Sequence, residues 1–173
     1  MRRVLVIGSG GSGKSTLSRR LGERLGLEVI HLDRLYWRAG WVEPPKDEWL
    51  RTVEALCARD AWVMDGNYSG TLEVRMAACD AVVFLDLPRV LCLWRVLKRL
   101  VMYRDGGRPD MAEGCREQFQ LDFLRWVWNY PNRSRPKVLR ALEKYAGRKE
   151  VFRLGSGAEV EEFLAGLEGH ASV

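Results

Sequence analysis

The sequence predicts one α/β domain built on a parallel β-sheet. Short apolar runs of strand length alternate along the chain with longer segments of helical periodicity, a pattern typical of parallel sheets. The first apolar run leads into a glycine-rich turn, and a helix striped with leucine follows that turn. The length of 173 residues suits one hydrophobic core, so we assign residues 1–173 to a single domain.

The composition is that of a globular protein with a moderate basic excess. Hydrophobic residues make up 47% of the chain and charged residues 29%, which argues against disorder. The formal net charge of +5 fits phosphate-bearing ligands without singling out nucleic acid. The four cysteines form no CxxC pair, so we expect reduced thiols and no zinc site. No apolar run could span a membrane and no signal-peptide pattern opens the chain, so we expect a cytoplasmic protein without membrane partners.

The remaining elements follow from apolar spacing and capping signals. Leu17, Leu21 and Leu25 recur every four residues and predict the first helix. Ser156 and Glu159 form a capping box that would begin the last helix. The other expected helices lie at 46–59, from 88 onward, at 116–128 and at 136–145, and the expected strands at 4–7, 27–32, 61–64, 81–85 and 150–154.

The segment from Pro88 predicts a long helix with two different faces. Apolar residues recur between Val90 and Val101 on one face, whereas Arg95 and Arg99 lie one turn apart on the other. Residues 105–110 break this helix and have the composition of a mobile loop.

Residues 8–15 match the phosphate-binding pattern GxxxxGK[ST] in full, between a strand and a helix as that pattern requires. The glycines let the backbone curl, so that successive N–H groups and the positive end of the helix face phosphate oxygens. Lys14 would reach the β- and γ-phosphates of ATP or GTP, and the Ser15 hydroxyl would help to hold Mg²⁺. The expected nucleotide-binding residues are Gly8, Ser9, Gly10, Gly11, Ser12, Gly13, Lys14, Ser15 and Thr16.

The same stretch also contains a dinucleotide-binding fingerprint, Gly8-x-Gly10-x-x-Gly13, with Asp33 near the distance expected of a ribose-binding acid. That interpretation leaves the lysine after the last glycine unexplained. We therefore favour the longer P-loop pattern and ATP with Mg²⁺ as the cofactors.

With its P-loop, the Asp65-Gly66 pair and the arginine helix after Leu87-Pro88, the chain resembles the adenylate-kinase-like branch of P-loop kinases. More closely, it resembles the bacterial group of DNA topology modulation proteins. This resemblance spans nearly the whole chain and implies a three-layer P-loop NTPase sandwich, a five-stranded parallel sheet in the order 2-3-1-4-5 and a short helical lid at about 99–132. The motifs that carry it are His31-Leu32-Asp33, Leu35-Tyr36-Trp37, Gly40-Trp41, residues 62–68, residues 108–111, residues 123–126 and Tyr130-Pro131.

Two aspartates follow predicted strands at the edge of the sheet where ligands gather. Asp65 is placed to orient Mg²⁺ together with Ser15, and we favour this role over capping a turn with Gly66. Asp33 would face the acceptor and bind or deprotonate its hydroxyl, although a role as a helix N-cap is equally open.

The resemblance implies that Arg95 and Arg99 neutralise the migrating phosphoryl group, although exposed helical arginines are often only solvated charge. Arg104, Arg108 or Arg116 could each be a mobile arginine of the lid. Lys14, Asp33, Arg95 and Arg99 are the expected catalytic residues.

The acceptor segment at 36–41 is aromatic, and Trp37 or Trp41 could stack on a flat ring, although packing is the favoured interpretation. No arginine pair for an acceptor phosphate stands between the second and third strands. Contact of residues 155–157 with the adenine is a further suggestion from the resemblance.

The sequence therefore predicts an ATP-dependent phosphotransferase acting on a small-molecule acceptor such as a nucleoside, a nucleotide or a hydroxylated metabolite. One alternative is a nucleotide-sensing regulator that binds DNA through the arginine- and aromatic-rich residues 125–140, which lack a recognisable DNA-binding motif. A nucleotide hydrolase switch without an acceptor is the third hypothesis.

Overall fold

The computed structural model describes residues 1–103, 111, 114–115 and 119–168 and shows one five-stranded parallel sheet. The strand order is β2-β3-β1-β4-β5, which confirms the fold class and the strand order expected from the sequence. The strands are β1 (Arg3–Gly8), β2 (Val29–His31), β3 (Trp62–Asp65), β4 (Ala81–Leu85) and β5 (Glu150–Leu154).

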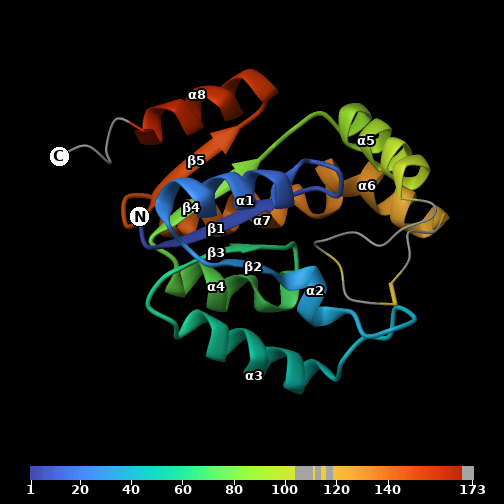
Figure 1. Cartoon of the computed structure of the whole chain (residues 1–173), viewed down its shortest axis with the longest axis horizontal. Coiled ribbons are helices and arrows are strands. Elements are labelled where there is room, and N and C mark those ends of the chain that lie inside the picture. The colour runs from blue at the N-terminus through green and yellow to red at the C-terminus, as the bar shows by residue number, and fades with distance from the viewer. Residues whose placement is uncertain (104–110, 112–113, 116–118, 169–173) are drawn as a thin grey trace.

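Helices cover both faces of this sheet, because neighbouring side chains of each buried strand point to opposite faces. Val4 and Val6 of β1 pack with α1 (Lys14–Leu25) and α8 (Gly157–Glu168). Leu5 and Ile7 of β1 pack into the larger core on the other face. That core is covered by α3 (Lys46–Cys57), α4 (Leu72–Ala78) and α7 (Arg135–Tyr145). Figure 1 shows α8 and α3 on opposite sides of the sheet, which gives the three layers.

Two further helices, α5 (Arg89–Met102) and α6 (Leu121–Arg133), pack against each other at one end of the molecule (Figure 1). The short helix α2 (Leu32–Tyr36) directly follows β2, and a 3₁₀ turn (Ser69–Thr71) precedes α4. Within the described residues, none of the helices combines the length and the apolar character that a membrane span needs.

The observed elements differ from the predicted ones in three places. The second strand ends at His31 rather than at residue 32, because the chain enters α2 at once. The helix expected at 116–128 begins at Leu121 and continues to Arg133, and residues 116–118 lie outside the described part. The sequence analysis missed α4, which is only seven residues long and carries the charged Arg75 on its buried side.

The register of the sheet brings chemically distinct residues to one edge. Asp65 at the end of β3 lies beside Val6 of β1 and beside His31 of β2. Gly8, where the P-loop begins, lies beside Leu85 at the end of β4. Because all five strands are parallel, their carboxyl ends form the edge where ligands bind in sheets of this kind.

Asp86 connects the end of β4 to two other elements. Its carboxylate accepts two hydrogen bonds from Arg135 of α7, at 2.8 and 3.0 Å, and one from Arg153 of β5 at 2.8 Å. Burial favours the protonated acid, but the two guanidinium groups outweigh that effect and lower the pKa of Asp86 below its usual value. The ion pairs therefore stabilise the sheet edge while Asp86 is ionised.

Gly22 shows how closely α1 approaches the second strand. A Cβ at this position would lie 2.3 Å from Cγ2 of Val29 and 2.9 Å from the carbonyl oxygen of Leu27. The glycine is therefore required by helix–strand packing, although glycine weakens a helix interior.

We expect Gly22→Ala to lower the free energy of unfolding by about 1–3 kcal/mol, because overpacking exceeds the gain in helix propensity. Gly166→Ala is the matched control, since a Cβ there meets no atom within 4 Å among the described residues. The control should leave stability unchanged or raise it by up to about 1 kcal/mol. Urea denaturation measures both changes, and a stabilised Gly22→Ala would contradict the packing argument.

We expect Asp86→Asn to destabilise the fold by about 1–3 kcal/mol at pH 7, because two guanidinium groups lose their anionic partner. The folded-state pKa of Asp86 is lowered, so the stabilisation is present above the unfolded value of about 3.9 and is lost as pH falls below it. The difference between the two proteins should therefore shrink toward pH 3. Asp122→Asn, which removes an exposed pair with Arg125, should change stability by less than about 0.5 kcal/mol.

Candidate active site

The P-loop forms a backbone cradle between β1 and α1. Gly11 and Gly13 have φ angles of 75° and 97°, which residues with a side chain rarely adopt. A Cβ on Gly11 would come within 2.2 Å of the carbonyl oxygen of Cys92 in α5. The glycines therefore allow both the curl of the loop and its close contact with α5.

Most of the predicted nucleotide-binding residues lie on one cavity. Gly10, Gly11, Gly13, Lys14, Ser15 and Thr16 line a large cavity, whereas Ser9 and Ser12 are buried in the loop and Gly8 ends β1. The hydroxyls of Ser9 and Ser12 have no hydrogen-bond partner in the described part of the chain. Buried polar groups without partners are unusual and suit a loop that binds a polar ligand.

Lys14 lies close to several charged groups beside the P-loop. Its Nζ donates to the carbonyl oxygen of Ser9 at 2.8 Å. Desolvation lowers the pKa of Lys14, while the carboxylates of Asp33 and Asp65 act in the opposite direction. The lysine and the two predicted aspartates therefore belong to one electrostatic cluster.

The two aspartates occupy different positions within that cluster. Asp65 is 2% exposed, and its Oδ2 lies 2.8 Å from Nδ1 of His31 at the end of β2. Asp33 lines the cavity, but it lies in the first turn of α2 rather than at the end of a strand. The sequence analysis missed the pairing of Asp65 with His31. It also placed Asp33 at the end of a strand, because it extended β2 to residue 32, whereas β2 ends at His31 and Asp33 lies in α2.

Arg95 and Arg99 both line the cavity from α5. An Nη1–H of Arg95 donates to the carbonyl oxygen of Ser12 at 3.2 Å, which brings the guanidinium against the P-loop. The side of α5 that carries the two arginines thus faces the P-loop. Much of the apolar stripe of α5 is exposed to solvent instead. The exposed fraction is 45–78% for Val90, Trp94, Leu97 and Val101.

Several predicted residues lie outside the described part of the chain. Arg104, Arg108 and Arg116 are among them, so the expected lid at 99–132 is described only through parts of α5 and α6 and a few residues between them. Half of the predicted capping box forms: the Glu159 amide donates to Ser156 Oγ at 3.2 Å, whereas the Glu159 carboxylate accepts from the amide of Gly155, at 2.9 Å, in place of that of Ser156.

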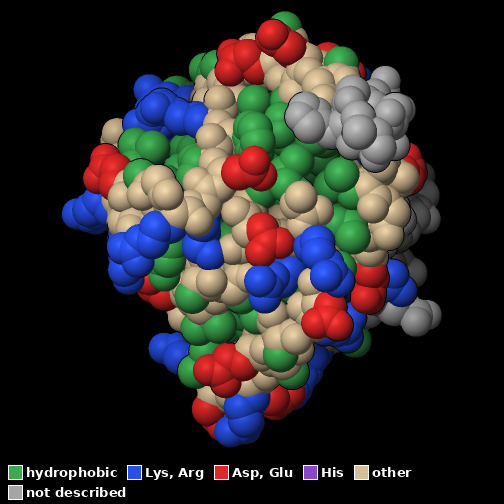
Figure 2. Space-filling model, turned by 90° about the vertical axis from the view of Figure 1, so that its left-hand side faces the viewer, with side chains coloured by type: hydrophobic (Ala, Val, Ile, Leu, Met, Phe, Trp, Pro, Cys, Tyr) green, Lys and Arg blue, Asp and Glu red, His purple; other side chains and the backbone are tan. Residues whose placement is uncertain are grey.

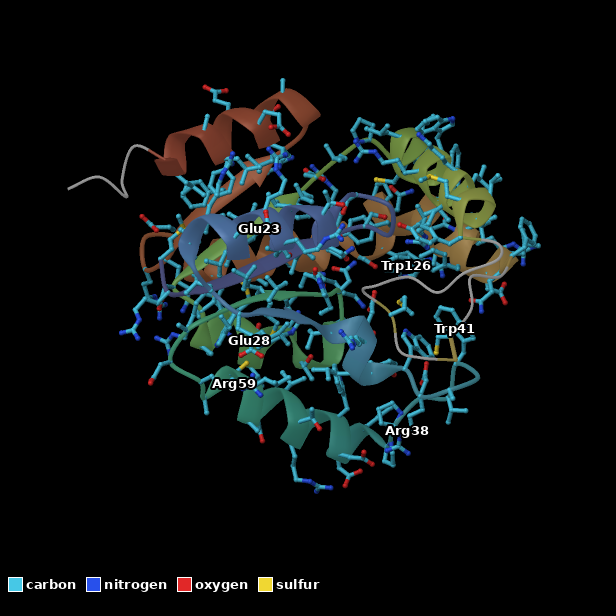
Figure 3. All side chains as sticks on the ribbon, viewed as in Figure 1. Glu23, Glu28, Arg38, Trp41, Arg59 and Trp126 are labelled. Atoms are coloured by element: carbon cyan, nitrogen blue, oxygen red, sulfur yellow. The ribbon has the colours of Figure 1, made fainter. Side chains whose placement is uncertain are left out.

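The cavity has a volume of about 1120 Å³ and extends from the P-loop to an aromatic wall. Trp37 and Trp41 both line it and contact each other edge to face, with ring centroids 5.3 Å apart. Figure 3 labels Trp41 after α2 and Trp126 on α6, two residues that line this cavity from different segments. The other aromatic residues of the wall are Tyr36, Trp49, Tyr68, Trp94, Tyr103 and Phe123.

Arg75 is a further feature that the sequence analysis missed. This arginine is fully buried in α4 and donates to the carbonyl oxygens of Gly66 at 2.9 Å, Tyr68 at 2.6 Å and Thr71 at 3.3 Å. Burial lowers its pKa to about 10, so the guanidinium stays charged at neutral pH. It therefore fixes the loop at 66–71, of which residues 67–71 line the cavity.

The strand order and the P-loop between the first strand and the first helix define the adenylate-kinase-like fold of the P-loop kinases. The solved structures that share this fold include a shikimate kinase from Acinetobacter baumannii in complex with shikimate, with a TM-score of 0.57 and 19% identity over 100% of this chain and 96% of that one. A gluconokinase from Sinorhizobium meliloti 1021 has a TM-score of 0.56 and 19% identity, over 98% of this chain and 93% of that one. A shikimate kinase from Bacteroides thetaiotaomicron has a TM-score of 0.54 and 15% identity, over 99% of each chain. No protein-family model and no curated protein matches the chain.

We expect Arg75→Met to lower the free energy of unfolding by about 2–3 kcal/mol, because three carbonyl groups lose a donor in a buried site. Arg59→Met is the control, since Arg59 forms an exposed pair with Glu28 and should cost less than about 1 kcal/mol. Chemical denaturation measures both, and equal stabilities of the two variants would show that Arg75 does not hold the loop.

Proposed function

We propose that the chain is a kinase that transfers the γ-phosphoryl group of ATP to a hydroxyl group of a small acceptor. The observation that carries the proposal is the meeting of Lys14, Arg95 and Asp33 around one cavity beside the P-loop. A phosphate cradle, cations for the migrating group and a carboxylate for the acceptor are the parts that phosphoryl transfer needs. Shikimate kinases and a gluconokinase among the solved structures with this fold support a small hydroxylated acceptor.

In the proposed reaction, the P-loop amides and Lys14 hold the β- and γ-phosphates, and Arg95 and Arg99 neutralise the charge that develops on the γ-phosphoryl group. The acceptor oxygen forms a bond to the γ-phosphorus as the bond to the β–γ bridging oxygen breaks, and ADP leaves. Asp33 takes the proton of the acceptor hydroxyl. Thr16 and the remaining loop residues complete the phosphate cradle.

The oxygen groups of Ser15 and Asp65 fit Mg²⁺, which prefers hydroxyl, carboxylate and phosphate oxygens. Ser15 lines the cavity at the start of α1, and the Asp65 carboxylate is close enough to act electrostatically on Lys14. When bound, Mg²⁺ would neutralise phosphate charge. His31 would keep the Asp65 carboxylate in place through its hydrogen bond.

We also propose that the chain belongs to the bacterial group of DNA topology modulation proteins and acts in the cytoplasm. Residues from two of the motifs that carry this resemblance pair with each other, His31 with Asp65 and Asp33 with Tyr68. A direct role in DNA binding is less favoured, because Arg125 and Arg135 are paired with Asp122 and Asp86. On the face drawn in Figure 2, acidic and basic side chains are interspersed rather than segregated.

The proposal is tested by ADP release from ATP and Mg²⁺ against a panel of nucleosides, nucleoside monophosphates and hydroxylated metabolites that includes shikimate. We expect one class to raise release well above background hydrolysis, and Lys14→Ala to lower that rate at least about 100-fold. Lys137→Ala, an exposed lysine of α7 outside the large cavity, should retain it. ATP binding without stimulation by any acceptor would overturn the small-molecule kinase proposal.

A further inference from the structure

A hydrogen bond joins the candidate base to the loop that follows the neighbouring strand β3. The Tyr68 hydroxyl donates to Oδ1 of Asp33 at 2.7 Å, and both residues line the cavity. Burial raises the pKa of Tyr68, and the carboxylate of Asp33 adds to this effect. The phenol therefore stays protonated and remains a donor at any physiological pH.

This bond fixes which oxygen of Asp33 is available for chemistry. Oδ1 accepts the proton of Tyr68, whereas Oδ2 accepts no hydrogen bond among the described residues. A carboxylate held through one oxygen loses its freedom to rotate, so the other oxygen keeps a constant direction. Proton transfer from an acceptor hydroxyl depends on such a fixed geometry, because a general base works only within hydrogen-bond reach.

Both the ring and the backbone carbonyl of Tyr68 are held in place by neighbouring residues. Its ring packs against Tyr36 and Trp49, with centroid distances of 4.4 and 5.1 Å. Its carbonyl oxygen accepts the 2.6 Å hydrogen bond from the buried Arg75. The phenol is therefore aimed by aromatic packing on one side and by a buried guanidinium on the other.

We propose that Tyr68 is a positioning residue that holds Asp33 so that Oδ2 faces the acceptor hydroxyl, and that Arg75 holds the loop that carries Tyr68. The inference rests on the proposed kinase function and extends it to two residues that touch neither ATP nor the reacting atoms. If Tyr68 served packing alone, its ring would be needed but its hydroxyl would not. Removing the hydroxyl oxygen therefore distinguishes a packing role from a role in positioning Asp33.

The test compares Tyr68→Phe, which keeps the ring and removes only the hydroxyl, with Tyr145→Phe. The control is matched because the Tyr145 hydroxyl also donates to a carboxylate, that of Glu73 at 3.4 Å, on the exposed surface away from the cavity. We expect Tyr68→Phe to lower kcat about 10- to 100-fold with the KM for ATP within about twofold of wild type. Wild-type kcat in Tyr68→Phe would overturn the proposal.

A second measurement keeps this test independent of the acceptor. Crystal structures of the wild type and of the two variants report whether Tyr68 holds the Asp33 carboxylate. A carboxylate plane that turns in Tyr68→Phe but not in Tyr145→Phe supports the positioning role, and an unchanged plane in Tyr68→Phe overturns it. If the wild type phosphorylates nothing in the panel, the kinase proposal fails, whereas the hydrogen-bond proposal is still decided by these structures.

Arg75→Lys tests the second half of the proposal, since lysine keeps the charge but loses the fork that reaches the carbonyl groups of the loop. Circular dichroism first establishes that the variant is folded. A fall in kcat comparable to that of Tyr68→Phe, with the KM for ATP retained, is the expected result. A folded variant with wild-type kcat and an unchanged orientation of the Asp33 carboxylate would show that Arg75 does not position Tyr68.

Discussion

The candidate site depends on the position of β1 between two parallel neighbours. Because β3 and β4 flank it in the same direction, the P-loop begins where two other strands also end. Asp65 at the end of β3 and Asp33 in the short helix that β2 enters both act electrostatically on Lys14. Antiparallel pairing of either neighbour would place its last residue at the far edge of the sheet. The cluster around Lys14 therefore requires parallel strands, whatever side chains those strands carry.

A second constraint is the contact between the P-loop and α5. Gly11 lies so close to the Cys92 carbonyl that no side chain fits there, and Arg95 is bonded to the carbonyl of Ser12. The inward side of α5 carries Cys92, Val96 and the two arginines, which explains why much of the apolar stripe of this helix remains exposed. An amphipathic pattern normally predicts burial of the apolar face. Here the side that carries the arginines is turned inward, where it contacts the P-loop.

The P-loop, the sheet order and the places of Arg95 and Arg99 were predictable, because each depends on a local motif, helical spacing or a resemblance along the chain. The bond between Tyr68 and Asp33 was not, since it joins residues 35 positions apart whose orientation is set by packing. Arg75 was missed because an arginine in an amphipathic segment normally indicates a solvated face. Its burial is explained by the folded structure, in which its guanidinium donates to the carbonyl oxygens of Gly66, Tyr68 and Thr71. The assigned catalytic roles remain predictions, as does the lid at residues that the structure does not describe.

The hydrogen bond from Lys14 to the carbonyl of Ser9 uses one of the three N–H groups of the ammonium. Among the described residues no further hydrogen bond to this ammonium is seen, so its other two N–H groups stay available while the first holds it in place. In the proposed function, a phosphate oxygen would meet a lysine whose position is already fixed, and charge-assisted hydrogen bonds of this kind are roughly twice as strong as neutral ones. A donor that is ordered before binding lowers the entropy cost of binding. The carbonyl of Ser9 would therefore act as a support for the ammonium as well as a part of the loop.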